Sequence, residues 1–394
     1  MSSGHRVRRA IRKAGLAAGL AVGAILAFLY WPGLPLDLDS PPDLRLSVAE
    51  SFGNDIGATG NVVGIEPFME TRDYATPERF EAKLRGYLDA ARARDWLRPG
   101  TIVLLPEHLN TWLLVAGEKP RAVTASTTSA AMIPIIAWHP LTFLKNFVLF
   151  ADADRAAAAV FRTKATETAR LTADIYARLA RDYGVWIAAG SGVMMTPGLY
   201  EHGALSYGHG PLFNAGFMFA PDGSPQGDAV RKVHPIPSET GFTRKARAAS
   251  LPLFEIGSHR AGILICADSW FADTTGTLAA AGADVLLVPS FLTSDWDAPW
   301  GGYLNDAPPD TDRAGSEDDW RADVGRIREG DAWLKYALPA KARAHGIRYG
   351  MNVFLKGRLW EIEGDGRAII LVDGETRLGS GTKAEAALYN LWMK

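Results

Sequence analysis

The sequence contains a single cysteine, Cys266, at the end of the apolar run in RAGILICADSW (residues 260–270). A free cysteine often behaves as a small buried hydrophobe. At the point where a strand gives way to a turn and a helix, however, its sulfur can also meet a ligand, and the thiolate is a good nucleophile. Two hypotheses therefore stand for Cys266: a core residue or a catalytic nucleophile.

Two charged residues occupy comparable positions. Glu107 ends the apolar segment TIVLLPE (residues 101–107), and Lys232 lies in a short β-like segment after the PDG turn at residues 221–223. Either residue alone is ordinary, because charged side chains are mostly solvated. The combination is less ordinary, since a carboxylate, an ammonium and a thiol each stand beside an apolar segment.

In this chain order, the three residues resemble the signature of the nitrilase superfamily of carbon–nitrogen hydrolases. LLPEHL is similar to the family's glutamate segment, FNAGFMFAPDG followed by VRKVHPIPSE to its lysine segment, and GILICADSWF to its cysteine segment, while NVVGIEP resembles its first strand. The resemblance covers approximately residues 58–372. It implies an α/β fold, the αββα sandwich, with the three residues gathered at one pocket.

The resemblance also implies a role for each residue. Glu107 would take the thiol proton, and Lys232 would stabilise the oxyanion of the tetrahedral intermediate together with a backbone N–H beside Cys266. The resulting thioester would be opened by water or by another nucleophile.

Two further acids are implied as substrate-binding or supporting residues. Glu239, seven residues after Lys232, is the best match to a second glutamate that helps hold the substrate in this family. The alternative is a loop carboxylate near Arg244 or Lys245. Asp268 is the acid that follows the cysteine in its segment.

Apolar segments and helical patterns alternate along the chain, which indicates one α/β domain over residues 45–394. Short β-like segments begin at residues 61, 101, 185, 213, 260 and 283. Helices are expected over residues 76–97, 154–183 and 330–345, the first with a proline and acids in its opening turn.

The N-terminus carries a membrane signal. A basic flank (residues 1–13) precedes an uncharged apolar stretch (residues 14–31) that is long enough to cross a bilayer as a helix. The pattern predicts an uncleaved signal anchor, followed by an extended linker (residues 32–44). We expect a single-pass protein of the cytoplasmic (inner) membrane with its catalytic domain on the extracytoplasmic or periplasmic side. The alternative is a cleaved signal peptide.

Two insertions depart from compact relatives. Residues 124–150 are apolar and could form a packed lid, or else an exposed patch that touches membrane or receives an acyl chain. Residues 294–323 mix tryptophan, proline, glycine and acids, and could roof a pocket.

The charge and the histidine pattern of the sequence limit the ligands and partners that we expect. A formal net charge of −2 gives no reason to expect nucleic acid, and the histidines show no close pairing typical of a metal site. We expect no metal and no cofactor, a small amide or nitrile as substrate, the membrane as a partner through residues 14–31, and a possible homo-oligomer through the glycines at 15, 19 and 23.

These features together predict a membrane-anchored hydrolase of the amidase type, acting on carbon–nitrogen bonds other than peptide bonds through a thioester. One alternative is an N-acyltransferase that passes the acyl group to an amine such as a lipoprotein. The other is a catalytically silent binding or scaffold protein on the same fold.

Overall fold

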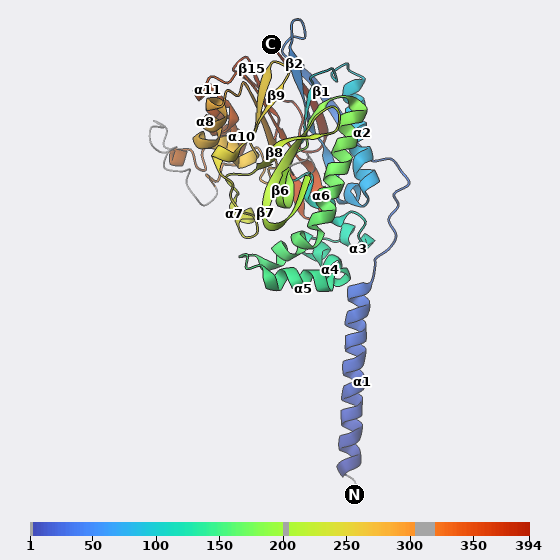
Figure 1. Cartoon of the computed structure of the whole chain (residues 1–394). Helices are drawn as coiled ribbons and strands as arrows, with labels where there is room; N and C mark the ends of the chain where they lie inside the picture. Colours follow the sequence, from blue (N-terminus) through green and yellow to red (C-terminus); the bar gives the residue numbers. More distant parts are fainter. Residues whose placement is uncertain (1–2, 200–204, 304–319) are drawn as a thin grey trace.

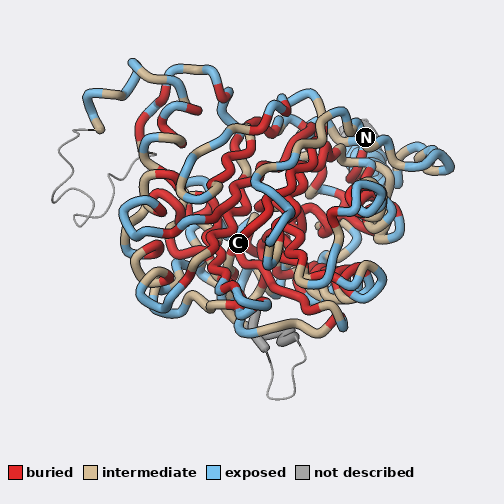
Figure 2. Tube along the Cα trace, turned by 90° about the horizontal axis from the view of Figure 1, so that it is seen from above, coloured by how far each residue is buried: buried red, intermediate tan, exposed pale blue. Residues whose placement is uncertain are grey.

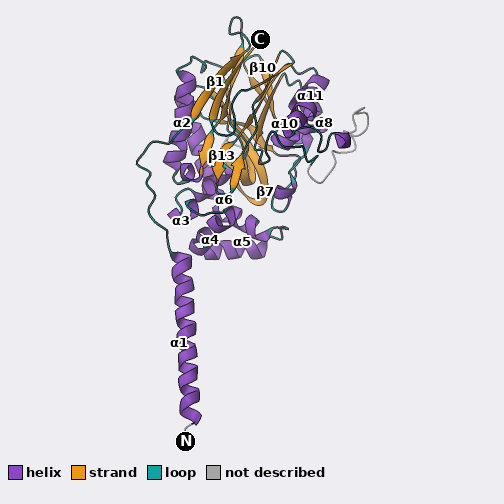
Figure 3. Ribbon diagram, turned by 180° about the vertical axis from the view of Figure 1, so that it is seen from behind, coloured by secondary structure: helices purple, strands orange, loops and turns teal. Residues whose placement is uncertain are grey.

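Two β-sheets face each other at the centre of the domain, and helices lie outside them (Figure 1, Figure 3). The structure, a computed structural model, describes residues 3–199, 205–303 and 320–394. The first sheet runs, in spatial order, through β1 (Leu46–Phe52), β17 (Ala386–Met393), β2 (Gly60–Glu66), β4 (Ile102–Leu104), β5 (Trp186–Ala188), β7 (Leu205–Phe219) and β6 (Gly192–Leu199), and β8 (Pro225–Arg231) pairs with β7.

The second sheet contains the strand that leads to Cys266. It runs through β16 (Glu375–Leu378), β15 (Ile369–Val372), β12 (Tyr349–Phe354), β11 (Val285–Ser290), β10 (His259–Ile263) and β9 (Leu253–Ile256). A small third sheet joins β14 (Ile362–Gly364), β13 (Lys356–Leu359) and β3 (Phe68–Glu70).

Alternation along the strands explains why both faces of each sheet are covered. On β4, Ile102 and Leu104 belong to the apolar cluster between the two sheets, whereas Val103 belongs to the cluster under the helices. On β11, Leu287 faces the same central cluster, whereas Leu286 packs with Leu278 and Leu338 of the helices outside the second sheet. Successive side chains of a strand point to opposite faces, so each sheet needs a cover on both sides.

The helices supply those covers. The first sheet is covered by α2 (Pro77–Arg92) and α6 (Arg155–Tyr183), and the second by α8 (Ala272–Ala280) and α11 (Leu338–Ala344), with α10 (Glu329–Tyr336) beside them. The expected αββα sandwich is therefore confirmed. Figure 2 shows the buried strands at the centre of the domain, inside a largely exposed periphery.

One predicted helix ends where its capping residues place it, and another ends earlier than predicted. The predicted helix 154–183 is observed as α6, whose start is capped by the Asp154 carboxylate, 3.0 Å from the Ala157 N–H, and whose end is Gly184 with φ of +65°. The helix predicted over 76–97 is shorter, because α2 stops at Arg92. Residues 93–96 instead form a turn, with Asp95 at a φ of +56°, that buries Trp96 in the core.

The helix predicted over 330–345 is wrong as a single helix. It divides into α10 and α11 at Ala337, which has φ of −90° and ψ of −144°. Pro339 lies directly after this break, and because it has no N–H it is accommodated at the start of the second helix rather than inside a continuous one.

The N-terminal helix α1 (Ser3–Tyr30) projects away from the domain (Figure 1, Figure 3). It begins before residue 14, so the basic flank continues the same helix from Ser3, while residues 1–2 lie outside the description. Its stretch Arg12–Tyr30 is long and apolar enough to be a membrane span or a signal sequence, and none of its residues is buried.

The predicted linker, residues 32–44, is extended but bound along α2. Arg79 donates to the Ser40 carbonyl at 2.8 Å, Tyr87 donates to the Leu44 carbonyl at 2.7 Å, and Lys83 donates to the carbonyl of Asp43. The segment thus ties α1 to the domain rather than forming a loose tether.

The first insertion forms two helices at the end of the domain nearest to α1, preceded by α3 (Pro120–Val123) (Figure 1). They are α4 (Thr128–Trp138) and α5 (Pro140–Leu149), and the chain bends by 108° between them. Ala131, Pro134 and Ile135 of α4 are buried, whereas α5, described along its whole length, has no buried residue.

The second insertion is described only outside residues 304–319. Trp296 and Trp300 are buried in the central cluster, and Trp300 stacks on Trp270 with ring centroids 6.1 Å apart. Trp270 ends the 3₁₀ turn that Cys266 begins, η4 (Cys266–Trp270). These tryptophans therefore support that turn from the core.

The remaining helical turns are η1 (Thr71–Tyr74), η2 (Thr111–Val115), α7 (Pro237–Thr240), η3 (Ala248–Ser250) and η5 (Trp320–Ala322).

Candidate active site

The fold brings Glu107 and Lys232 into direct contact, with Cys266 beside them. Glu107 follows β4, which is parallel to β2 and β5, Cys266 follows β10, which is parallel to β11, and Lys232 comes directly after β8. All three side chains are buried. The Lys232 ammonium lies 2.7 Å from Oε1 of Glu107, and both residues act electrostatically on the Cys266 thiol.

Both oxygens of the Glu107 carboxylate are held by fixed donors. Oε1 accepts from Lys232 and from the side-chain amide of Asn214 at 2.9 Å, while Oε2 accepts from the backbone N–H of Phe291 at 3.0 Å. The same N–H of Phe291 also acts on the Cys266 sulfur. The carboxylate therefore cannot rotate without losing several bonds, and its orientation beside the thiol is set by the fold.

Lys232 lies between two carboxylates. Its Nζ atom is 2.7 Å from Glu107 and 2.6 Å from Oε2 of Glu239. Burial by itself would lower the pKa of Lys232, but the negative charges of Glu107 and Glu239 outweigh that effect and hold this pKa well above its ordinary value. The two carboxylates thus favour the charged ammonium form of Lys232.

Glu239 is part of this cluster rather than a loop carboxylate near Arg244 or Lys245. It lies in α7, is buried, and accepts from Lys232, from Asn214 at 2.6 Å and from the Ile236 N–H at 3.0 Å. Its Oε1 also lies 3.1 Å from Nε2 of His108. Although burial raises the pKa of Glu239, the cation Lys232 and the His108 contact reverse the shift, so that its pKa lies well below the ordinary value.

Cys266 has a strained backbone, with φ of +50°. A residue other than glycine rarely adopts this left-handed conformation, and such strain gathers at functional sites. Burial, and then the negative charge of Glu107, raise the pKa of the thiol well above its ordinary value, although Lys232 opposes them. This environment favours the protonated thiol over the thiolate, so a nucleophilic role for Cys266 would require a base that removes its proton.

Asp268 joins the lysine segment to the cysteine segment. Its carboxylate accepts from the backbone N–H groups of Val233 at 3.0 Å, His234 at 2.7 Å and Ile265 at 3.3 Å. Burial raises the pKa of Asp268 to about 7, against the lowering effect of the His234 hydrogen bond. Asp268 thus ties the backbone beside Lys232 to the backbone beside Cys266.

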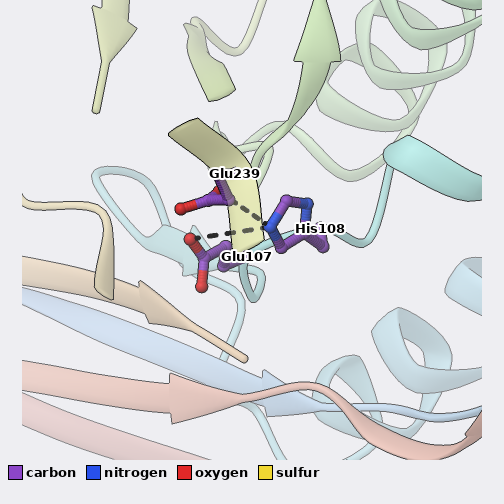
Figure 4. A group of neighbouring side chains, drawn as sticks. All are labelled: Glu107, His108 and Glu239. Carbon is purple, nitrogen blue, oxygen red and sulfur yellow. Dashed lines mark hydrogen bonds and ion pairs between the residues drawn. The ribbon is translucent and has the colours of Figure 1, made fainter. Parts of the chain in front are cut away.

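Glu107, His108 and Glu239 also lie close enough together to hold a metal ion, since their ligand atoms fall within 4.8 Å of one another. Figure 4 shows the two carboxylates and the imidazole directed toward one another. Lys232, however, already donates to both carboxylates and supplies the positive charge that an ion would bring. The arrangement favours a lysine-centred ion-pair network over a metal centre.

The sequence did not predict two groups of the site, the Asn214 side chain and the Phe291 backbone N–H. Asn214 lies within the FNAGF segment, where an amide inside an apolar strand is the one signal that could have pointed to it. The Phe291 contribution comes from its backbone, so its side-chain type carries no signal. His108 could be noticed by its place next to Glu107, but not by any metal-ligand spacing.

The sequence matches the family model described as carbon-nitrogen hydrolase over residues 102–304, just over half of the chain. The chain belongs to the carbon–nitrogen hydrolase family. The matched region of this carbon–nitrogen hydrolase contains Glu107, Lys232, Glu239 and Cys266.

Among solved structures, this carbon–nitrogen hydrolase is similar to an amidase from Nesterenkonia sp., at 15% identity and a TM-score of 0.48 over 86% of this chain and 91% of that chain. A variant of that amidase in complex with butyramide matches at 14% identity and a TM-score of 0.48, covering 86% and 92%. Another, with acrylamide added to its active-site cysteine, matches at 13% and 0.46, covering 85% and 93%. No curated protein matches the sequence.

Proposed function

We propose that this carbon–nitrogen hydrolase is an amidase that acts through a thioester on Cys266. The observation that carries the proposal is the Lys232 ammonium held between Glu107 and Glu239 beside a buried, protonated thiol. These groups are the nucleophile, base and cation that acyl transfer from an amide requires.

The acylation step follows from these contacts. Glu107 takes the proton of Cys266 as the sulfur attacks the amide carbon, and the carbonyl oxygen becomes an oxyanion that the Lys232 ammonium stabilises. When the tetrahedral intermediate collapses, the carbon–nitrogen bond breaks and the leaving nitrogen receives the proton that Glu107 holds. Ammonia or an amine departs, and the acyl group remains on the sulfur.

Hydrolysis completes the cycle. Glu107, again a free carboxylate, removes a proton from a water molecule that attacks the thioester carbon, and the intermediate expels the Cys266 sulfur with return of that proton. The carboxylic acid leaves and the thiol is restored. Glu239 and Asn214 hold Lys232 and Glu107 in place through both steps.

We also propose that Arg12–Tyr30 anchors the enzyme in the cytoplasmic membrane, with the domain on the extracytoplasmic side. The support is the length and apolar composition of this helix and the basic residues that precede it. Docking of residues 32–44 along α2 would keep the domain next to the membrane.

Acyl transfer to an amine is the second candidate. It is favoured by the apolar surface of α5, because such a surface suits a substrate or acceptor that carries an acyl chain. The thioester would be the same, and an amine would replace water in the second half of the cycle.

A product assay on the full chain in detergent separates these functions. With a panel of aliphatic and aromatic amides, hydrolysis predicts ammonia and free acid without any added acceptor. Transfer instead predicts little free acid under any of these conditions, and an acylated amine as the product once a primary amine is added. Absence of both products, and of any covalent adduct on Cys266, would support a silent scaffold and overturn the proposed activity. For variants of the buried carboxylates Glu107 and Glu239, the matched control is Glu255→Gln, because the Glu255 carboxylate is exposed.

A further inference from the structure

The end of the domain nearest to α1 carries an exposed apolar surface formed by α4 and α5. Seven large apolar side chains of these two helices are exposed: Ile133, Trp138, Leu141, Leu144, Phe147, Val148 and Leu149. Leu141 is 82% exposed and Val148 is 67% exposed, on a helix that has no buried residue. Isolated exposed leucines are normal, but seven exposed large apolar side chains on two consecutive short helices indicate an interaction surface.

This surface is continuous with the end of the candidate membrane span. Tyr30, the last residue of α1, packs edge-on against Trp138 of α4 with ring centroids 5.7 Å apart. The guanidinium of Arg121 in α3 lies over the Phe28 ring, 3.9 Å from its centroid, and also donates to the Phe28 carbonyl. The Arg121 N–H donates to Pro32 at 2.9 Å. The height of the two helices relative to α1 is therefore fixed by packing.

The charges of this region also suit a membrane surface. Neither α4 nor α5 contains an acidic residue, and Lys145 of α5 is exposed. Lys119 holds its ammonium 4.2 Å from the centre of the Trp138 ring. Tyrosine and tryptophan gather at the boundary between hydrocarbon and headgroups, and lysine and arginine interact there with anionic lipids.

The two helices are not suited to cross the membrane. Each has 11 residues or fewer, and they bend by 108° at His139 and Pro140. A span needs about 20 apolar residues in one helix. The inner face of α4, with Ala131 and Ile135, is already buried in the domain core. What remains is a short apolar helix that can lie in the plane of the interface.

We infer that α5 and the exposed face of α4 lie in the interfacial layer of the bilayer that α1 enters, and hold the domain flat against it. The inference rests on the anchoring role of α1 in the proposed function. A single hydrogen bond links the segment after α5 to the candidate active site. The Asp154 N–H donates to the Gly241 carbonyl at 2.8 Å, and Gly241 directly follows α7, the helix that carries Glu239. The bilayer contact would therefore hold the active site at a fixed distance from the membrane surface.

Spin labels on the full chain in vesicles of phosphatidylethanolamine and phosphatidylglycerol test the inference. In a Cys266→Ala background, single cysteines replace Leu144 or Val148 on α5, Ile25 within α1, and Ile56 as the matched control. Ile56 is 78% exposed and lies in the loop beside the C-terminus, at the opposite end of the domain. Each nitroxide is then probed with oxygen, which concentrates in lipid, and with a water-soluble nickel chelate.

The inference predicts that labels at 144 and 148 are accessible to oxygen and shielded from nickel, less deeply than the label at 25, while the label at 56 is open to nickel. Nickel-accessible labels at 144 and 148, with the label at 25 in lipid, would overturn the inference and leave the anchor standing. Labels at 144 and 148 shielded from both probes would also overturn it, because they would indicate a protein contact. A nickel-accessible label at 25 would contradict the anchor itself.

Discussion

At the scale of single residues, the site buries three charges and one thiol in contact with one another. Burying Glu107, Glu239 and Lys232 is costly unless each charge is paired, and here each carboxylate lies within 2.7 Å of the ammonium. An apolar cluster of the same volume would often be at least as stable. The arrangement is therefore better explained by the proposed chemistry than by stability.

The protonation state of Cys266 gives the first prediction. Because burial and Glu107 raise the pKa of the thiol, we expect iodoacetamide to label it more slowly than free cysteine at neutral pH and faster as the pH rises. Glu107→Gln removes a negative charge and should move this labelling profile to lower pH. Intact mass gives the labelled fraction without ambiguity, since the chain has one cysteine. Labelling of the wild type faster than free cysteine at pH 7 would contradict this account. So would a labelling profile of Glu107→Gln that is the same as that of the wild type. The exposed control, Glu255→Gln, should keep the wild-type profile.

Glu239 gives a prediction for acid stability. Its folded pKa lies below the ordinary value of 4.5, so the unfolded chain binds more protons as the pH falls. The stability that this carboxylate contributes is complete above about pH 4.5 and is lost as the pH falls toward the folded pKa. Glu239→Gln should therefore lower the urea midpoint of unfolding at pH 7 more than at pH 3.5. An equal loss at both pH values would show that the ion pair does not contribute, and Glu255→Gln should change neither midpoint.

Glu107, Lys232 and Cys266 were predicted from the resemblance of their segments and chain order to the carbon–nitrogen hydrolases, because a charged side chain or a thiol at the end of an apolar run is ordinary by itself. Asn214 and the Phe291 N–H could not be predicted in the same way. Their contribution depends on which strand lies beside which across the sandwich. That pairing joins segments more than 100 residues apart.

At the scale of secondary structure, short turns rather than long helices or strands carry several residues of the candidate site. Cys266 begins η4, Glu239 lies in the four-residue α7, and Asp268 ties the segment after β8 to the one after β10. Strand ends of two sheets are rigid, and short turns on such ends hold side chains with little freedom. The sequence predicted the strands from their apolar runs but misjudged the helix over 330–345, because an apolar helical pattern continues through the break at Ala337.

The cap of α6 gives a prediction at this scale. Asp154 accepts from the Ala157 N–H with its side chain, and its backbone N–H binds Gly241. Asp154→Ala removes the cap and should destabilise the domain by about 1 kcal/mol, whereas Asp154→Asn should keep most of that stability. The backbone bond to Gly241 survives in both variants, so turnover per folded molecule should be nearly unchanged. Urea unfolding and an amide assay check the two parts, and an Asp154→Ala variant as stable as the wild type would refute the capping role.

At the scale of the whole molecule, the described chain is a four-layer domain joined to the apolar helix α1 by a docked segment. The αββα architecture was predictable from the resemblance, and the apolar helix from composition. The docking of residues 32–44 on α2 was not, because it depends on backbone carbonyls that meet Arg79 and Tyr87. The sequence also left open whether residues 124–150 pack against the domain or stay exposed. In the structure, α4 packs against the domain with one side, whereas α5 has no buried residue.

The anchor gives a prediction that concerns the whole chain. If Arg12–Tyr30 stays uncleaved in the membrane with its basic end inside, the full chain remains with membranes after a carbonate wash, and a periplasmic reporter fused after Lys394 is active. Replacing Leu20 and Ile25 by arginine should abolish membrane retention, because charges near the centre of a span cost several kcal/mol. Recovery of a soluble chain that lacks about its first thirty residues would establish a cleaved signal peptide instead.

The central claim, that Cys266 carries the acyl group, is tested most directly by intact mass after an acid quench during turnover of a short amide. The account predicts a mass increase equal to the acyl group on Cys266, absent in Cys266→Ala, together with loss of turnover in Cys266→Ala and in Glu107→Gln. Lys232→Met should lose turnover by roughly 10²- to 10³-fold, as for loss of one oxyanion donor, while the exposed control Lys245→Met keeps it. Full turnover in Cys266→Ala, or an adduct on any residue other than Cys266, would contradict the account.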